Sequence, residues 1–185
     1  MAPSPDFELR PASSAAGAPD GMERLWTPHR MAYIASHKEP AADPPCPFCV
    51  APGLDPVESL VVWRGEAVYA VLNLYPYNPG HLLICPYRHV ADYTDLSHQE
   101  TVELAQASQR AMRVLRRASA PAGFNLGLNQ GPVAGAGVAG HLHQHVVPRW
   151  AGDANFFPIV AQTKAVPELL GQTQAKLAAV WSEVD

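Results

Sequence analysis

Three histidines occur at every second position of the stretch His141–Arg149, which reads HLHQHVVPR. Because side chains alternate between the two faces of a β-strand, a strand here places His141, His143 and His145 on one face, with neighbouring imidazoles about 6–7 Å apart. Imidazole serves as a nucleophile, a proton donor or acceptor, or a metal ligand. Since a glycine-rich segment precedes them, we interpret the three as a phosphate-handling device; the alternative is a metal-binding or surface histidine run.

The glycine-rich segment is Gly131–Gly140, with four glycines in ten residues. Glycine lets the backbone approach an anion closely, and successive N–H groups form concavities that bind anions. An ordinary flexible connection is the alternative interpretation. The position of the segment directly before the histidines favours a phosphate-binding loop.

A second candidate site begins at Cys46-Pro47-Phe48-Cys49, which has the Cys-x-x-Cys spacing of a zinc knuckle. Two thiolates at this spacing can bind one tetrahedral ion, which needs two further ligands. The alternatives are two unlinked thiols or a redox pair of the thioredoxin type, which requires a βαβ context that is not seen. Cys85 falls within a predicted strand and is interpreted as a small buried hydrophobic residue.

Composition limits the class of protein. A chain of 185 residues with 48% hydrophobic residues suits one domain with one core, and a net charge of −4 argues against a basic nucleic-acid-binding surface. The absence of an apolar run of 18 residues predicts no membrane span. Three cysteines and an N-terminus without signal-peptide features favour a protein of the reducing cytoplasm.

The elements that must position these residues follow from periodicity. We expect a flexible segment at 1–21 and a single domain at 22–185, which opens with a helix at 22–36 and a proline-dense loop at 40–56. Strands are predicted at 60–63, 67–74, 81–86, 124–130 and over the histidines. A helix at 97–119 carries a capping box of Ser97 and Glu100, and a last helix covers 167–181. This order predicts an α+β fold with an antiparallel sheet.

These motifs together resemble the histidine-triad (HIT) family, whose signature His-φ-His-φ-His-φ-φ matches His141–Val147. Further matches are the segments NPGH at 78–81 and ICP at 84–86, Asn129 with Gly131, and Ala134-Gly135, so the resemblance spans 46–157. The segments at 73–80 and 148–156 are similar to those of the bacterial diadenosine polyphosphate phosphorylases and hydrolases of this family. The resemblance implies a HIT-like antiparallel sheet with a long helix and a C-terminal helix, in a homodimer.

The resemblance also implies roles for matched residues. His143 is expected to attack the α-phosphorus and form an adenylyl-histidine, His145 to contact phosphate oxygens and assist the leaving group, and His81 to complete the catalytic histidines. Some HIT proteins bind structural zinc, which implies Cys46, Cys49, His89 and His141 as ligands; magnesium is expected only with the substrate. The implied nucleotide- and phosphate-binding residues are Asn73, Asn129, Gly135, Gly137, Val138, His145 and Trp150, although core or dimer packing is the commoner role of such a tryptophan.

The chain departs from the family pattern at two places. Gln144 stands where the signature has an apolar residue, on the face opposite the imidazoles, where we expect either a wetter back of the strand or a local hydrogen bond. The loop has Gly137-Val138-Ala139 where relatives often carry a hydroxyl that contacts phosphate near the leaving group. His145 itself argues against the uridylyltransferase branch, which lacks the third histidine.

The resemblance therefore implies an enzyme that cleaves dinucleoside polyphosphates of the diadenosine tetraphosphate type, by phosphorolysis or by hydrolysis. Two alternatives remain at this point. One is a phosphoramidase that acts on nucleoside phosphoramidates, and the other is a nucleotide-binding regulator with low turnover. The expected partners are a nucleotide and a second copy of the chain, without nucleic acid or membrane.

Overall fold

The computed structural model describes residues 45–153 and 168–184, all of which belong to one compact unit, Pro44–Asp185. The predicted flexible segment at 1–21, the helix at 22–36 and the domain boundary between them lie outside the described residues. The same holds for Pro167, the expected start of the last helix.

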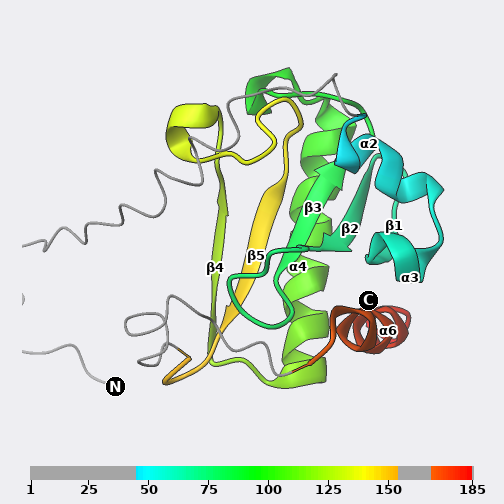
Figure 1. Ribbon diagram of the computed structural model, residues 1–185, viewed down its shortest axis with the longest axis vertical. Coiled ribbons are helices and arrows are strands. Elements are labelled where there is room, and N and C mark those ends of the chain that lie inside the picture. Colours follow the sequence, from blue (N-terminus) through cyan, green and yellow to red (C-terminus); the bar gives the residue numbers. More distant parts are fainter. Residues whose placement is uncertain (1–44, 154–167, 185) are drawn as a thin grey trace, which may run out of the picture. The chain divides into compact units, whose positions relative to one another are not determined.

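A single antiparallel sheet forms the centre of this unit, which confirms the predicted fold class (Figure 1). Its strand order is β1-β2-β3-β5-β4, so β4 forms one edge and β5, which carries His145, lies between β3 and β4. Each predicted strand is present with somewhat different ends: β1 (Val61–Arg64), β2 (Val68–Leu72), β3 (Leu82–Pro86), β4 (Gly123–Leu128) and β5 (Gln144–Arg149).

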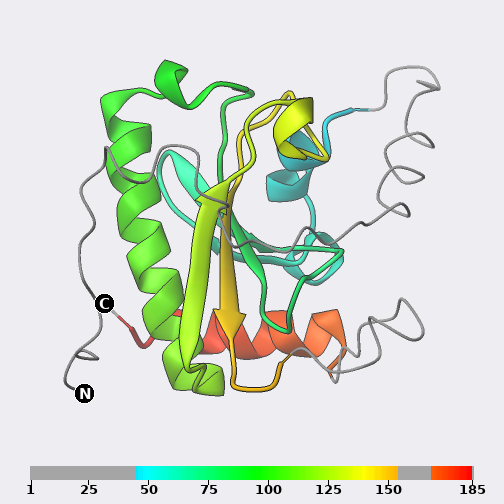
Figure 2. The ribbon, with the colours of Figure 1, turned by 90° about the vertical axis from the view of Figure 1, so that its left-hand side faces the viewer.

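One long helix covers a face of the sheet, and a second lies against the edge strand β1. Helix α4 (His98–Ser119) begins with the predicted capping box, because Ser97 Oγ accepts the Glu100 N–H and the Glu100 carboxylate accepts the Ser97 N–H. It packs on β2, β3 and β5, while α6 (Leu170–Trp181) packs on α4 and β1 (Figure 2). Among the described helices, none combines the length and the apolar character needed to cross a membrane.

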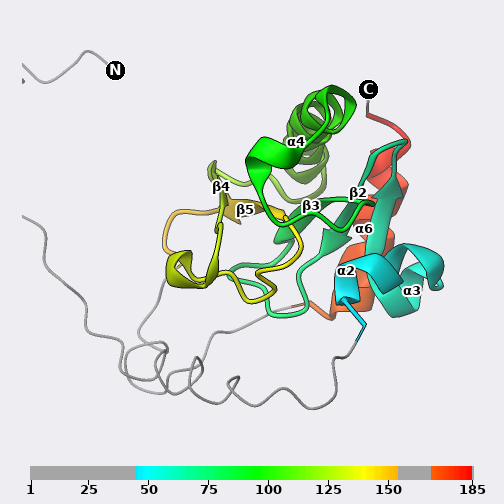
Figure 3. The same cartoon turned by 90° about the horizontal axis from the view of Figure 1, so that it is seen from above.

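Both faces of the central strands are buried, which explains the near-continuous apolar runs of β2 and β3. The larger core lies between the sheet and the two long helices and includes Leu82, Ile84, Val146, Leu177 and Trp181. Figure 3 shows the short helix at 47–50, labelled α2, on the side of the sheet away from α4. There Phe48 packs against a smaller core of five buried residues: Val61, Tyr69, Val71, Leu83 and Cys85. The interpretation of Cys85 as a small buried hydrophobic residue is confirmed, since its exposure is 0%.

The turn between β1 and β2 shows how α4 orders the sheet. The Glu103 carboxylate accepts the backbone N–H groups of Glu66, Ala67 and Val68, and the Gly65 N–H donates to the Val68 carbonyl oxygen at 2.9 Å. A Cβ atom at Gly65 would collide with the Glu103 carboxylate and the Trp63 ring. Glycine is therefore required at this turn because α4 approaches it closely.

The expectation of a loop at 40–56 is wrong for its described part. This part contains two short helices, α2 (Pro47–Val50) and η2 (Ala51–Gly53), and α3 (Pro56–Ser59) begins at its end. Each of the three has a proline in one of its first two positions, where no intrahelical partner for the N–H is needed and the fixed φ suits a helix. The density of prolines indicated helix starts rather than a loop without secondary structure.

Candidate active site and cysteine–histidine cluster

The histidine stretch is only partly a strand, so the expectation of a strand across all three histidines is wrong. Strand β5 begins at Gln144, and in the sheet His145 lies opposite Leu83 of β3 and Gly127 of β4. Just before β5, the Leu142 N–H donates to the Val90 carbonyl oxygen at 2.7 Å. Since Val90 lies in a loop, this part of the chain is paired with a loop residue and not with a neighbouring strand.

The backbone determines the protonated nitrogen of His143. Its Nδ1 lies 2.8 Å from the carbonyl oxygen of His141. Because a carbonyl oxygen can only accept, Nδ1 must carry the hydrogen, and the lone pair of the neutral ring is then on Nε2. The residue is 7% exposed, and burial lowers the pKa of His143 below its usual range. A neutral imidazole with its Nδ1 held in this way is a competent nucleophile at Nε2.

A second chain of hydrogen bonds determines the protonated nitrogens of His81 and His145. The Tyr77 N–H donates to His81 Nδ1 at 3.0 Å, so His81 carries its hydrogen on Nε2. His81 Nε2 lies 2.9 Å from His145 Nδ1, so His145 accepts there and carries its own hydrogen on Nε2.

His145 is therefore a neutral donor. Its Nε2 is buried and has no hydrogen-bond partner within the described part of the chain. Burial, and secondarily the neighbouring His143, lowers the pKa of His145 to about 4. The His143 and His145 rings are 5.2 Å apart between centroids, so a lone pair and an N–H donor lie next to one another. We call His81, His143 and His145 the histidine trio.

A pocket of about 420 Å³ opens beside His145. Gly127, directly opposite His145 in the sheet, leaves open space there, because a Cβ atom on it would have no neighbour within 4 Å. The pocket has both polar and apolar walls and is lined by Tyr77, Asn78, Asn125, Leu126, Gly127, Leu128, Asn129, His145, Val147, Arg149 and Asp153.

The structure brings only part of the predicted nucleotide-binding set to this pocket. Asn129 and His145 line it. Asn73 lies at the other side of the trio, with Nδ2 3.4 Å from His81 Nδ1. Trp150 lies after β5 and donates its indole N–H to the Ser119 carbonyl oxygen at the end of α4. In the glycine-rich loop, Gly135 ends a short 3-10 helix with φ of +89°, and Gly137 and Val138 follow in a bend.

The sequence interpretation did not include Tyr77, which forms one wall of the site. Its ring is stacked on that of His145 at 5.8 Å and lies 4.8 Å from that of His81. The only signal for it was the position four residues before His81.

A polar network at another part of the pocket wall was also not predicted. Asp153 accepts from the Arg149 guanidinium at 2.6 and 2.9 Å and from Asn78 Nδ2 at 2.7 Å, and Arg149 also donates to Asn125 Oδ1 at 2.8 Å. The Arg149 guanidinium holds the pKa of Asp153 well below its usual range. The spacing of four residues between opposite charges was the available signal for this pair.

The four residues implied as metal ligands do come together. The ligand atoms of Cys46, Cys49, His89 and His141 all lie within 4.8 Å of one another, and we call this group the cysteine–histidine cluster. His141 Nδ1 is 3.4 Å from both sulfur atoms, and His89 Nδ1 is 3.3 Å from Cys49 Sγ. A tetrahedral ion bound by thiolate at about 2.3 Å and imidazole at about 2.0 Å would separate these atoms by about 3.5 Å. The cluster can therefore hold a metal ion.

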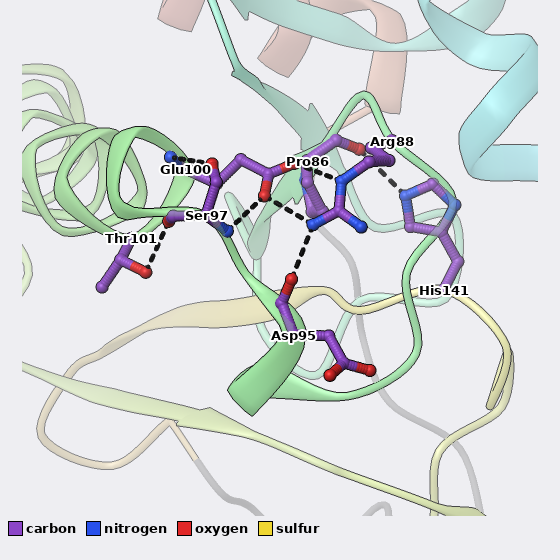
Figure 4. A network of polar contacts seen from close by, with 7 residues as sticks. All are labelled: Pro86, Arg88, Asp95, Ser97, Glu100, Thr101 and His141. Atoms are coloured by element: carbon purple, nitrogen blue, oxygen red, sulfur yellow. Dashed lines mark hydrogen bonds and ion pairs between the residues drawn. The ribbon is translucent and has the colours of Figure 1, made fainter.

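Surrounding groups orient His141 and fix the chain next to His89. His141 Nε2 donates to the Pro86 carbonyl oxygen at 2.9 Å, which leaves Nδ1 for the metal (Figure 4). The guanidinium of Arg88, next to His89, makes two bonds of 3.0 and 2.7 Å to Glu100 in the capping box of α4. The hydrogen bond from this guanidinium is the main reason why the pKa of Glu100 is lowered to about 2. The chain around His89 is thus tied to the start of α4 (Figure 4).

Gln144 makes a local hydrogen bond, one of the two outcomes expected for it. Its Nε2 donates to Ser108 Oγ of α4 at 2.6 Å, and Ser108 Oγ donates to the Leu104 carbonyl oxygen at 2.7 Å. The polar residue between His143 and His145 is therefore satisfied on the side of the sheet that α4 covers, away from the pocket.

Comparison with known proteins agrees with this geometry. The HIT domain model matches residues 56–152. A protein of Mycobacterium tuberculosis called AP-4-A phosphorylase is 51% identical over 171 residues, which cover 90% of this chain and 88% of that protein. The asymmetrical bis(5'-nucleosyl)-tetraphosphatase of Schizosaccharomyces pombe is 34% identical over 53% of each chain.

Solved structures show the same fold. A zinc-bound histidine triad family protein from Mycobacterium smegmatis aligns with a TM-score of 0.60 and 26% identity over 75% of this chain and 94% of that chain. A hypothetical histidine triad nucleotide-binding protein from Sulfolobus tokodaii gives a TM-score of 0.60 and 27% identity over 75% and 93% of the two chains.

Proposed function

Because the chain belongs to the histidine-triad (HIT) family, we propose that it cleaves dinucleoside polyphosphates of the diadenosine tetraphosphate type through an adenylyl-histidine at His143, and that inorganic phosphate is the acceptor. The observation that carries this proposal is the Nδ1 bond of His143 to the His141 carbonyl oxygen, which directs a lone pair to Nε2 beside a neutral N–H donor. The name of the mycobacterial relative supports the substrate and favours phosphorolysis over hydrolysis.

In the first step, His143 Nε2 attacks the α-phosphorus of one adenosine. A phosphorus–nitrogen bond forms, the bond from that phosphorus to the bridging oxygen breaks, and ATP leaves. The ring becomes positively charged, and its Nδ1–H bond to the His141 carbonyl oxygen stabilises that charge. His145 Nε2–H donates a hydrogen bond to the phosphate or to the departing oxygen, which is possible because no group within the described ranges accepts from it.

In the second step, an oxygen of inorganic phosphate attacks the same phosphorus. The phosphorus–nitrogen bond breaks, ADP forms and His143 returns to its neutral state. Water in place of phosphate would give AMP, so the two reactions differ only in the acceptor. Dividing one difficult displacement into two easier ones is the general advantage of a covalent route.

Substrate contacts follow from the positions of the remaining residues. We assign Asn129 and the backbone amides of Gly135, Gly137 and Val138 to phosphate or ribose, and Asn73 to the nucleoside. Asn129 supports this assignment by lining the pocket. Trp150 receives the weakest support, because its indole N–H is already bonded to Ser119. Magnesium would enter with the polyphosphate rather than on a carboxylate site.

Product analysis tests the proposal. The protein is incubated with diadenosine tetraphosphate, with and without inorganic phosphate, and the products are identified by mass spectrometry. ADP plus ATP that depends on phosphate is the expected result, whereas AMP plus ATP would replace phosphorolysis by hydrolysis. Absence of turnover in both arms, with turnover of an adenosine phosphoramidate, would overturn the proposal in favour of a phosphoramidase.

We propose zinc as the ion of the cysteine–histidine cluster, because two thiolates and two imidazoles are ligands that zinc prefers. Four protein ligands leave no coordination position for substrate, so its role is structural. The ion would connect the segment of Cys46 and Cys49 to His89 and to His141, which lies directly before β5. We also propose a cytoplasmic location, which is supported by three cysteines that are all free thiols in the structure.

We further propose a homodimer in which the sheet continues across two copies. Strand β4 is an edge strand, and the exposed fraction of Leu126, at its centre, is 50%. An edge with unpaired backbone groups and an exposed aliphatic side chain is suited to pair with another strand. Sedimentation analysis of the wild type and of Leu126→Lys is the test, and dissociation of the variant is expected.

A further inference from the structure

Phe48, the residue between the two cysteines of the cluster, contacts the ring of the nucleophile. The centroids of the Phe48 and His143 rings are 4.9 Å apart with an interplanar angle of 37°. We propose that Phe48 is a positioning residue for His143, and that metal binding at the cysteine–histidine cluster acts on the nucleophile through this ring. The inference deepens the proposed function, since it rests on His143 as the nucleophile.

The backbone of Phe48 is held by the two flanking cysteines of the cluster and by a hydrogen bond from Tyr69. Cys46 and Cys49 belong to the cluster, and the short helix α2 (Pro47–Val50) carries Phe48 between them. The hydroxyl of the fully buried Tyr69 donates to the Phe48 carbonyl oxygen at 2.6 Å. An ion that joined both cysteines would therefore hold the backbone of Phe48 against the smaller core.

His143 needs such a support. It lies outside β5, and among residues 45–153 and 168–184 its ring has one hydrogen bond, from Nδ1 to the His141 carbonyl oxygen. One bond permits rotation of an imidazole about that contact, which would move Nε2 away from the direction of attack. The Phe48 and His145 rings, at 4.9 and 5.2 Å, limit that rotation. Misplacement of a reacting group by about 1 Å can lower the rate about 100-fold, so we expect this restriction of the His143 ring to affect the reaction rate.

Two contacts connect the cluster to the nucleophile, one through the His141 backbone and one through the Phe48 ring. His141 supplies the carbonyl oxygen that accepts from His143, while the ring of the same His141 belongs to the cluster. Phe48 contacts both rings, since its centroid is also 5.5 Å from that of His141. A metal ion that never touches substrate would thus order both neighbours of the nucleophilic ring.

The test compares Phe48→Leu with the control Val50→Ala in the full-length, zinc-loaded protein. Val50 lies on the same short helix with an exposed fraction of 38%. For each variant, zinc content, KM, the single-turnover rate of His143 adenylation and the imidazole ¹⁵N shifts of His143 are measured. Phe48→Leu is expected to retain zinc and KM, to lose about 10- to 100-fold in adenylation rate, and to move the His143 shifts from one tautomer toward a mixture.

Val50→Ala is expected to match the wild type in all four measurements, and Phe48→Tyr, which keeps the ring, is expected to restore rate and shifts. A wild-type rate and unchanged shifts in Phe48→Leu would overturn the inference. If Phe48→Leu does not fold, Phe48→Met at saturating zinc is judged by the same criteria. The shifts are read in the free protein, so altered shifts in a chain that forms no adenylyl-histidine would reject the proposed function and retain the Phe48–His143 contact.

Discussion

The cysteine–histidine cluster and the histidine trio are neighbours in the chain, but they use imidazole in opposite ways. His141 donates from Nε2 to the Pro86 carbonyl oxygen and turns Nδ1 toward two sulfur atoms. His143, two residues later, donates from Nδ1 to the His141 carbonyl oxygen and keeps its lone pair on Nε2. The carbonyl oxygen that accepts from each histidine therefore decides which ring nitrogen is free, and with it whether the residue can serve as a metal ligand or as a nucleophile.

The comparison shows that residue type alone does not assign a role. In both groups a backbone group selects the tautomer, and the other nitrogen then faces thiols in the cluster or, at His143, keeps its lone pair for reaction. The cluster has its four ligand atoms directed at one point, as suits a closed structural site. In the trio, the His143 lone pair lies next to the His145 N–H, which has no partner among the described residues, and His145 lines a pocket, as suits a reaction.

The largest expected effect comes from removing the nucleophile. His143→Ala should lower turnover of diadenosine tetraphosphate by about 10⁴-fold or more, since no other group forms the covalent bond. Affinity for AMP, measured by calorimetry, should stay near that of the wild type. The exposed His98 on α4 provides the control, and His98→Ala should retain full activity. Turnover of His143→Ala within about tenfold of the wild type would contradict the division of roles.

The next effect comes from the cluster. Cys46→Ser should release zinc and lower the midpoint of thermal unfolding by roughly 5–10 °C, because metal binding is coupled to folding. Chelation of the wild type should give the same shift, and added zinc should reverse it only in the wild type. Adenylation should fall much less than in His143→Ala. An unchanged midpoint after verified loss of zinc would show that the cluster does not stabilise the fold.

A smaller effect concerns the dependence of stability on pH. Burial lowers the pKa of His145 to about 4, so between about 6.5 and 4 the unfolded chain binds a proton there that the folded protein does not. The contribution of His145 to the free energy of unfolding is present above pH 6.5 and should decrease by up to about 3 kcal/mol as the pH falls to 4. Urea unfolding of the wild type and of His145→Gln between pH 4.5 and 7 measures it, and equal pH slopes for the two proteins would refute it.

The smallest effect is expected behind the trio. Gln144→Leu removes the hydrogen bond to Ser108, whose hydroxyl keeps its bond to the Leu104 carbonyl oxygen. We expect a loss of about 1 kcal/mol or less in the free energy of unfolding and turnover within about twofold of the wild type. The double variant with Ser108→Ala should differ little from Gln144→Leu. A large loss of turnover would mean that this face takes part in positioning the histidines.

Local patterns in the sequence were sufficient for much of the fold. The capping box of Ser97 and Glu100 located the start of α4, and short apolar runs between turn residues located the strands of the antiparallel sheet. The ends of β5 were not predictable in this way. They depend on the bond from Leu142 to Val90, a residue more than fifty positions away, which competes with strand pairing.

Residue types and spacing determined by themselves that this chain carries a triad of histidines, a Cys-x-x-Cys pair and a glycine-rich loop, because each is a short motif whose chemistry is local. The tertiary structure decided which nitrogen each histidine presents, which aromatic ring supports His143 and which ligands share one point in space. Cys46 and His141 are 95 residues apart, yet their ligand atoms are 3.4 Å apart. Hydrogen bonds and ring contacts act over a few ångströms, so they exist only once folding has brought such distant segments together.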